Sequence, residues 1–273
     1  MINYSLIVSD FDGTLRRDAG GISETNARAI REYISNGGIF AICTGRMMSS
    51  ILPHAQSLGL ESLLIAYQGA LILDLKSGKT LRNIHHSAQE AAQICLVMEK
   101  MGLHIHVYDG DNFYTNKNDW LLAEYERICG VKGVLAEEDL SSLVLKKNIE
   151  PQKVLAMVEP KDRNAVYNKV TSVLGKNFNV TTSSDALVEV TKMGCEKGDA
   201  VRFLAEYYNI PCGKVAAIGD NINDIPMIKA AGLGVAVGNA EEALKEVADV
   251  VTCTNNEDAV AHIIKIYGMG EMK

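Results

Sequence analysis

Short apolar runs alternate with longer segments of helical period along the first third of this 273-residue chain. The runs "SLIVS" (5–9), "IFAIC" (39–43) and "LLIAY" (63–67) predict strands, with one helix capped by Ser23 and ended at Gly37, and another over 48–58. A hairpin is predicted about "KSGK" (76–79). This order of strands and helices predicts a parallel sheet with helices on both faces.

The pattern changes from about residue 85 and returns near residue 186. Between them the sequence predicts a helix over 87–101, a hairpin turned at "DGDN", a strand from Lys153, a helix from Asp162 and the strand "FNVTTS". Strands at 186–190, 214–220 and 233–237, with helices from Lys197 and Ile222, then restore the alternation. We therefore predict a doubly wound, mostly parallel α/β core (Rossmann-like) of residues 1–84 and 186–273. An inserted α+β domain spans 85–185.

The amino-acid composition indicates which binding partners and which cellular location to expect. Lys and Arg total 27 against 34 Asp and Glu, and the chain has no basic stripe, so no nucleic-acid partner is expected. The longest stretch without charged residues, 47–60, is shorter than the ~20 apolar residues of a membrane helix, so no membrane partner is expected. A strand within five residues of Met1 leaves no room for a signal peptide, which predicts a cytoplasmic protein. The six cysteines show no CxxC pairing, and neither a disulfide nor a structural zinc is expected.

Acidic residues recur at the ends of the predicted strands. Asp10 and Asp12 follow the first strand and Thr44 the second, while Asp220 and Asp224 follow a later one. Ligands of doubly wound sheets bind beyond the carboxyl ends of the strands. An isolated DxDG is usually a turn, and Asp224 could be a helix cap. Four carboxylates at one edge, however, repel one another unless a cation lies among them, and such oxygen ligands suit Mg²⁺.

Four motifs carry a resemblance to a known family. "DFDGTL", "CTGR", "CEKGDA" and "GDNINDIPM", in this order, closely resemble the motifs of the haloacid dehalogenase superfamily, specifically its Cof-type (subfamily IIB) phosphatase branch. The resemblance covers essentially the whole chain. In that branch a cap domain lies between the second and third motifs, which matches 85–185. The resemblance implies an Mg²⁺-dependent phosphatase that hydrolyses small phosphorylated metabolites such as sugar phosphates.

The resemblance also implies a role for each motif residue. Asp10 would attack phosphorus to form an aspartyl-phosphate, and Asp12 would act as general acid and base. The spacing of two places both side chains on the same side of an extended segment. The implied Mg²⁺ ligands are Asp10, Asp12 through its carbonyl oxygen, Asp220 and Asp224. The implied phosphate ligands are Thr44, Gly45, Lys197 and Asn223, with Arg46, Asn221 and Asn239 as further candidates.

Two positions depart from the family pattern. Gln68 in "YQGA" stands where relatives commonly have Asn, and Lys192-Met193 stands where many have proline. Both departures bear on substrate contacts and not on the proposed nucleophile or metal ligands. We expect specificity to reside in 85–185, with candidates between Tyr108 and Tyr114 and at Trp120, but the sequence does not identify the substrate.

Parts of the sequence resemble the signatures of other protein functions. Cys43 lacks the arginine spacing of a cysteine phosphatase loop, and Val237 breaks the dinucleotide fingerprint in "GLGVAVG". His104 and His106 could bind a metal, but strand residues of the cap are the favoured interpretation. A phosphomutase acting on sugar phosphates stays open, as does a non-catalytic phosphorylatable switch. The expected oligomeric state is a monomer or a weak homodimer.

Overall fold

The computed structural model describes residues 2–270, which form two compact units. The first unit comprises 2–45, 52–81 and 196–270, and the second unit comprises 46–51 and 82–195. No helix among these described residues is both long enough and apolar enough to cross a membrane.

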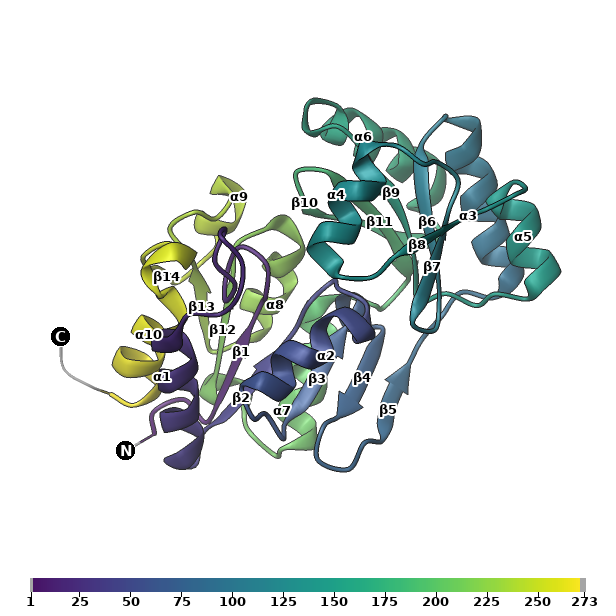
Figure 1. The fold of residues 1–273 in the computed structure, drawn as a ribbon. Coiled ribbons are helices and arrows are strands. Elements are labelled where there is room, and N and C mark those ends of the chain that lie inside the picture. The colour runs from purple at the N-terminus through teal and green to yellow at the C-terminus, as the bar shows by residue number, and fades with distance from the viewer. Residues whose placement is uncertain (1, 271–273) are drawn as a thin grey trace. The chain divides into compact units, whose positions relative to one another are not determined.

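A five-stranded parallel sheet forms the centre of the first unit (Figure 1). Its strand order is β14 (Val250–Val251), β13 (Leu233–Ala236), β12 (Val215–Gly219), β1 (Leu6–Ser9) and β2 (Ile39–Ile42). Leu6 lies opposite Val215 on one side and Ile39 on the other. All four residues of β1 are buried, as expected for a strand covered on both faces.

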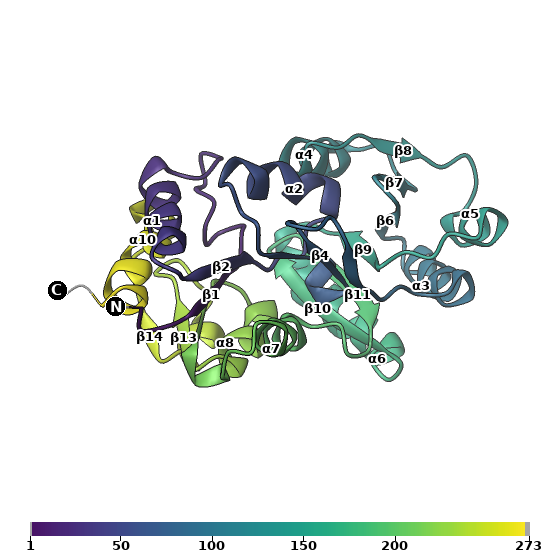
Figure 2. The same cartoon turned by 90° about the horizontal axis from the view of Figure 1, so that it is seen from below.

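Helices cover both faces of this sheet. They are α1 (Glu24–Ser35), α7 (Lys197–Tyr207), α8 (Ile225–Ala230), α9 (Glu242–Lys245) and α10 (Ala259–Ile263). Figure 2 shows α1 and α10 on one face and α7 and α8 on the other. As predicted, Ser23 caps α1, and its side chain accepts a hydrogen bond from the amide of Asn26. Helix α2 (Met48–Ser57) includes residues of both units.

The third predicted strand exists and takes part in two pairings, of which only the parallel one was expected. β3 (Leu63–Ala66) runs antiparallel to β4 (Leu71–Asp74), and with β5 (Thr80–Asn83) they form a separate three-stranded sheet. A single parallel bridge between Cys43 and Ile65 is its link towards β2. The tight turn Tyr67–Gly69 (η1) reverses the chain, so that β4 pairs with one edge of β3 while the bridge to Cys43 lies on the other.

A six-stranded sheet organises the second unit. Its order is β10 (Phe178–Ser184), β11 (Leu187–Lys192), β9 (Lys153–Met157), β6 (His104–Asp109), β7 (Asn112–Thr115) and β8 (Gly133–Leu135). One face packs against α3 (Ala88–Lys100), α5 (Leu140–Lys147) and α6 (Arg163–Leu174) in a core that includes Ile105 and Val107. On the other face, α4 (Trp120–Cys129) brings Tyr125 against the rings of His106 and Phe113.

The boundary predicted at residue 185 requires correction. It separates β10 from β11, yet β11 lies between β10 and β9 and is antiparallel to both. The strand predicted at 186–190 therefore belongs to the second unit, which ends at Cys195. The sequence also did not predict α4 and α5, although Asp119 caps α4 by accepting hydrogen bonds from the amides of Leu121 and Leu122.

Candidate active site

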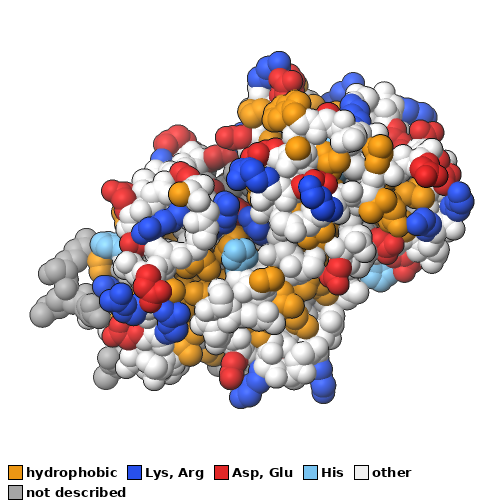
Figure 3. All heavy atoms as spheres, in the orientation of Figure 1, with side chains coloured by type: hydrophobic (Ala, Val, Ile, Leu, Met, Phe, Trp, Pro, Cys, Tyr) orange, Lys and Arg blue, Asp and Glu red, His pale blue; other side chains and the backbone are white. Residues whose placement is uncertain are grey.

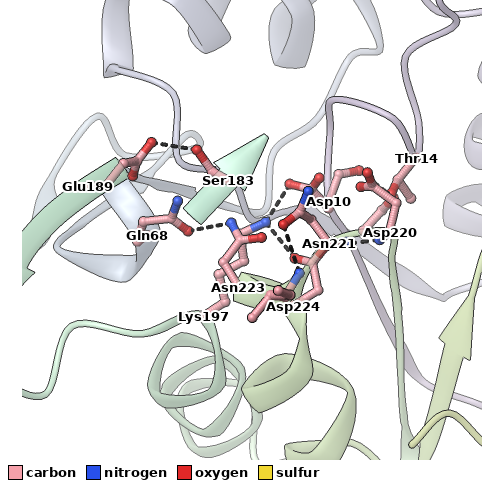
Figure 4. Close-up of polar contacts among 12 residues, drawn as sticks. Asp10, Thr14, Gln68, Ser183, Glu189, Lys197, Asp220, Asn221, Asn223 and Asp224 are labelled. Carbon is pink, nitrogen blue, oxygen red and sulfur yellow. Dashed lines mark hydrogen bonds and ion pairs between the residues drawn. The ribbon is translucent and has the colours of Figure 1, made fainter. Parts of the chain in front are cut away.

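The carboxyl ends of the parallel strands bring the acidic motifs of the first unit together (Figure 4). Asp10 directly follows β1, and its amide donates a hydrogen bond to the carbonyl of Ile218 in β12 at 2.9 Å. Asp220 directly follows β12. Asp224 follows four residues later, at the end of the 3₁₀ turn η4 (Ile222–Asp224) that leads into α8. Residues more than two hundred positions apart thus share one edge of the sheet.

Lys197, the first residue of α7, lies between two of these carboxylates. Its Nζ atom donates to Asp10 Oδ1 and to Asp224 Oδ1, each at 2.6 Å. The Lys197 side chain is 1% exposed, so both ion pairs are shielded from water. Since an unpaired buried ammonium is very costly, the two carboxylates fix the position of Lys197.

Both carboxylate oxygens of Asp224 accept hydrogen bonds from neighbouring groups. While Oδ1 accepts from Lys197, Oδ2 accepts from the amides of Asp220 at 2.9 Å and Asn221 at 3.1 Å. The Asp224 residue is completely buried. Its carboxylate therefore ties the loop after β12 to the start of α7.

The loop that follows β1 holds the side chain of Asp220 in place. Thr14 Oγ1 donates a hydrogen bond to Asp220 Oδ1 at 2.8 Å. A Cβ atom at Gly13 would lie 2.4 Å from Asp220 Oδ2, and Gly13 has a φ of +73°. Any side chain at position 13 would collide with this carboxylate and strain the backbone, so only glycine lets the two loops approach each other.

Burial and mutual repulsion dominate the electrostatics of this group. Burial raises the pKa of Asp10 to about 7, although the Lys197 ammonium acts in the opposite direction. Burial, together with the charges of Asp10 and Asp224, also raises the pKa of Asp220 well above its usual range. Burial alone would lower the pKa of Lys197, but the two carboxylates beside it raise the value. Lys197 is therefore a fixed positive charge.

Asp12 occupies a more open position than Asp10. Its side chain is 37% exposed, and an oxygen of its carboxylate lies 3.7 Å from Arg16 Nη1. The carboxylate of Asp12 is not part of the Asp10, Asp220 and Asp224 group. The family resemblance implies a metal contact through the carbonyl oxygen of Asp12, and that role stays a prediction.

The second motif follows β2. Thr44 is buried, its amide donates to the carbonyl of Ile65 at 3.0 Å, and Gly45 comes next. Arg46 belongs to the second unit, and its Nη1 atom donates to Ser50 Oγ at 3.1 Å. The hydrogen bond from Thr44 to Ile65 therefore lies within the first unit, and the one from Arg46 to Ser50 lies within the second unit.

Asn221 and Asn239 use their side chains to support the site loops. Asn221 Oδ1 accepts from the amide of Ile222 at 2.8 Å. Asn239 Nδ2 donates to the carbonyl of Gly13 at 2.8 Å, while its Oδ1 accepts from the amide of Asn255 at 2.9 Å. Both ends of the Asn239 side-chain amide are thus hydrogen-bonded. The bond from Nδ2 to Gly13 anchors the loop that carries Asp10 and Asp12.

Comparison with known proteins identifies the family. A family model of haloacid dehalogenase-like hydrolases matches residues 7–264. The chain belongs to this family. It is 33% identical over 266 residues to a 5-amino-6-(5-phospho-D-ribitylamino)uracil phosphatase of Bacillus subtilis, with 97% of this chain and 96% of that protein covered. A second phosphatase of Bacillus subtilis is 31% identical over 294 residues, with 95% and 98% covered.

The fold of this chain matches that of a solved structure of the same family. A haloacid dehalogenase-like hydrolase from Bacillus subtilis superimposes with a TM-score of 0.86 at 26% identity, covering 96% of this chain and 99% of that one. The resemblance to the Cof-type branch and the α/β fold class predicted from the sequence are confirmed. So is the predicted enzyme class, a phosphoric monoester hydrolase.

The residues of this haloacid dehalogenase-like hydrolase fit a divalent cation. Carboxylate oxygens of Asp10, Asp220 and Asp224 all lie within 4.8 Å of one another. Lys197 supplies one positive charge against these three carboxyl groups. Burial first, and then the charges of the neighbouring carboxylates, raise the pKa values of Asp10 and Asp220, and a cation would offset that repulsion. Because all the ligand atoms are oxygens, a hard ion such as Mg²⁺ suits the group.

Two site residues were not assigned a role from the sequence. Thr14 lies inside "DFDGTL", yet only the structure shows its bond to Asp220. Gln68 departs from the family pattern, and it accepts a hydrogen bond from Asn223 Nδ2 at 2.9 Å. The available signal for Gln68 was its place directly after the third strand, where the first two strands carry Asp10 and Thr44.

Proposed function

We propose that this chain is an Mg²⁺-dependent phosphatase that hydrolyses small phosphomonoesters through an aspartyl-phosphate on Asp10. The observation that carries the proposal is the Asp10 carboxylate, held at the end of β1 by the buried Lys197 ammonium within a group of three acidic side chains. Asp10, Asp220 and the carbonyl oxygen of Asp12 would hold the ion. Mg²⁺ bound there would offset the charge of the phosphate and of the carboxylates around it.

The first half of the reaction transfers the phosphoryl group to the protein. An oxygen of Asp10 attacks phosphorus and forms a P–O bond as the bond between phosphorus and the alcohol oxygen breaks. Asp12 donates a proton to that leaving oxygen. Lys197 neutralises charge that builds up on the phosphoryl oxygens, and it needs no reorganisation because Asp224 already holds it.

The second half releases phosphate. Asp12, now ionised, accepts a proton from a water molecule whose oxygen attacks phosphorus, and the bond to Asp10 breaks. The exposure of Asp12 supports this role, since its carboxylate is open to water while that of Asp10 is buried. Thr44, the Gly45 amide and Asn223 would bind the phosphate oxygens in both halves.

Charge and relatives support a small phosphorylated metabolite as the substrate. The chain carries a net charge of −7, and acidic and basic side chains are interspersed over the face shown in Figure 3. Neither feature favours a polyanion. Because one relative is named for 5-amino-6-(5-phospho-D-ribitylamino)uracil, this ester belongs in a substrate panel beside hexose phosphates, flavin mononucleotide and pyridoxal phosphate.

The test is turnover of p-nitrophenyl phosphate and of that panel, with Mg²⁺ and after complete chelation by EDTA. We expect chelation to abolish turnover, and Mg²⁺ to restore it. Asp10→Asn should remove activity, whereas Asp12→Asn should lower kcat by about 10²–10⁴-fold as expected for loss of proton transfer. Glu32→Gln, at an exposed position of α1, is the control and should be unchanged. Turnover that survives chelation, or an active Asp10→Asn protein, would refute the mechanism.

A further inference from the structure

The loop between β1 and α1, residues 10–22, carries Asp12. No helix or strand lies within these residues, and Arg16 joins the loop to itself by isolated bridges to Asp12 and to Ile22. The Arg16 guanidinium also faces Asp12, with Nη1 3.7 Å from Oδ1. Loops of this kind are usually more mobile than the elements that they connect. The acid and base of the proposed mechanism therefore depends on contacts that hold this loop from outside.

A segment more than two hundred residues away supplies such contacts. It is the 3₁₀ turn η5 (Asn255–Glu257), which follows β14. Asn255 Nδ2 donates to the carbonyl of Arg16 at 3.0 Å and to Asp18 Oδ1 at 2.8 Å. Asn256 Nδ2 donates to Asp18 Oδ2 at 2.8 Å, while its Oδ1 accepts from the amide of Asp18 at 3.1 Å. Both oxygens of the Asp18 carboxylate are thus bonded to this turn, and these bonds lower the pKa of Asp18.

Asn255 is the central residue of these contacts. It is 1% exposed, and its side-chain nitrogen donates both of its hydrogen bonds to the loop. Its backbone amide donates to Asn239 Oδ1 at 2.9 Å, and Asn239 Nδ2 in turn donates to the carbonyl of Gly13. Asn255 therefore holds the loop at two points near Asp12: at Arg16, whose guanidinium faces the carboxylate, and through Asn239 at Gly13, the next residue in the chain.

We propose that Asn255, bonded to Asp18 and to the carbonyl of Arg16, is a positioning residue that holds Asp12 in place for proton transfer. The inference rests on the proposed function, in which Asp12 protonates the leaving alcohol. Such a transfer requires the two heavy atoms to approach within hydrogen-bond reach. A misplacement of about 1 Å can cost about 10²-fold in rate. Because Asn255 acts on the loop, its loss should affect the step that uses Asp12 more than any other.

The test compares two esters that differ in their need for an acid. p-Nitrophenolate leaves phosphorus readily without a proton, whereas the alcohol of a hexose phosphate must be protonated as it leaves. We measure kcat/KM for p-nitrophenyl phosphate and for the hexose phosphate that is hydrolysed fastest. This ratio covers the reaction only as far as the departure of the alcohol, so the later role of Asp12 as a base does not enter it.

The variants separate positioning from folding. Asn255→Leu keeps a side chain of similar size and removes both donors, and it is also combined with Asp12→Asn. Asp18→Ala removes the partner of Asn255 at an exposed position, so it tests the same contact if Asn255→Leu does not fold. Asn26→Leu is the matched control: Asn26 is completely buried in the same unit, and its Oδ1 accepts from the amide of Ala261 at 2.8 Å, which joins α1 to α10.

We expect Asn255→Leu to lower kcat/KM about 10²-fold for the hexose phosphate and less than about threefold for p-nitrophenyl phosphate. Asp18→Ala should change the two values in the same sense by a smaller factor. In the Asp12→Asn background, Asn255→Leu should add nothing for the hexose phosphate. Asn26→Leu should lower both values by the same factor, because loss of folded protein does not distinguish the two esters.

Two results would overturn the inference: an equal change for both esters in Asn255→Leu and in Asp18→Ala, or full additivity of Asn255→Leu with Asp12→Asn. If the wild-type protein hydrolyses neither ester, the proposed function fails separately. Hydrogen exchange at the backbone amides of residues 12–18 then tests the positioning role. Faster exchange in Asn255→Leu and Asp18→Ala than in Asn26→Leu is expected, and equal exchange in all three variants would reject that role.

Discussion

The carboxylate of Asp224 holds three neighbouring groups of the candidate site in place. Both of its oxygens are used, one by the ammonium of Lys197 and the other by two backbone amides. A direct bond to a metal ion would compete with these contacts. We therefore assign Asp220 the metal contact implied for the fourth motif and Asp224 the task of holding Lys197 in place.

A substitution tests this assignment. Asp224→Asn removes the negative charge and one acceptor oxygen, which leaves the buried Lys197 paired with Asp10 alone. Breaking a buried ion pair of this kind typically costs about 3–5 kcal/mol, so the free energy of unfolding should fall by about 3 kcal/mol. Urea unfolding at neutral pH without Mg²⁺ measures the loss. Glu242→Gln, which breaks the exposed pair with Lys245, should cost less than about 1 kcal/mol. Equal losses in both variants would contradict the assignment.

The motifs predicted the acidic and basic side chains that the structure brings together, but not the side chains that support them. Asp10, Lys197 and Asp220 each follow or begin an element whose period is visible in the sequence. Thr14 and Gln68 are different, because their partners lie 206 and 155 residues away. No local pattern encodes such a contact, so only the fold could show that these residues belong to the site.

The sequence identified strands more reliably than their partners. β3 and β11 were both predicted as strands, yet β3 also takes β4 as an antiparallel partner and β11 lies in the sheet of the second unit. A buried strand shows the same apolar run whichever neighbours it has. The short turn at Tyr67–Gly69 decides the partner of β3, and the antiparallel register with β9 and β10 decides the place of β11.

Strand β6 carries a pair of buried histidines that should make the second unit sensitive to acid. The Nε2 atoms of His104 and His106 lie 3.1 Å apart, and Asp119 lies 2.9 Å from Nδ1 of His104. Burial lowers the pKa of His106 well below its usual range, with His104 and Lys153 acting in the same direction. Within the described residues, neither histidine joins a group of three or more metal-type ligands.

The pH dependence follows from this lowered pKa. Below about pH 6.5 the unfolded chain binds a proton at residue 106 that the folded protein does not, so stability falls as the pH decreases from 7 to 5. His106→Phe should flatten the slope of the unfolding free energy against pH in this interval, by up to about 1.4 kcal/mol per pH unit. Tyr125→Phe perturbs the same ring cluster without removing a titrating imidazole, and it should keep the slope. An unchanged slope in His106→Phe would reject this explanation.

The two units differ in how the chain builds them. The first unit is assembled from three separate segments, whereas almost all of the second is the continuous stretch 82–195. That stretch contains all six strands of the second sheet and a core of its own, formed by α3, α5 and α6. A continuous segment with its own core can fold independently if no internal strand is missing.

We therefore predict that the excised fragment 82–195 folds, while the fragment 85–185 suggested by the sequence does not. The shorter fragment lacks β11, which lies between β10 and β9, so both neighbours lose their hydrogen-bonding partner and the buried Val188 and Val190 are lost from the core. Cooperative thermal unfolding by circular dichroism and dispersed amide resonances should be seen for 82–195 alone. A fragment 82–185 restores the N-terminal residues but still lacks β11. It separates the effect of the N-terminal truncation from that of the C-terminal truncation, and it should also stay unfolded. If 85–185 melts as cooperatively as 82–195, β11 is dispensable and the second unit ends where the sequence pattern placed its boundary.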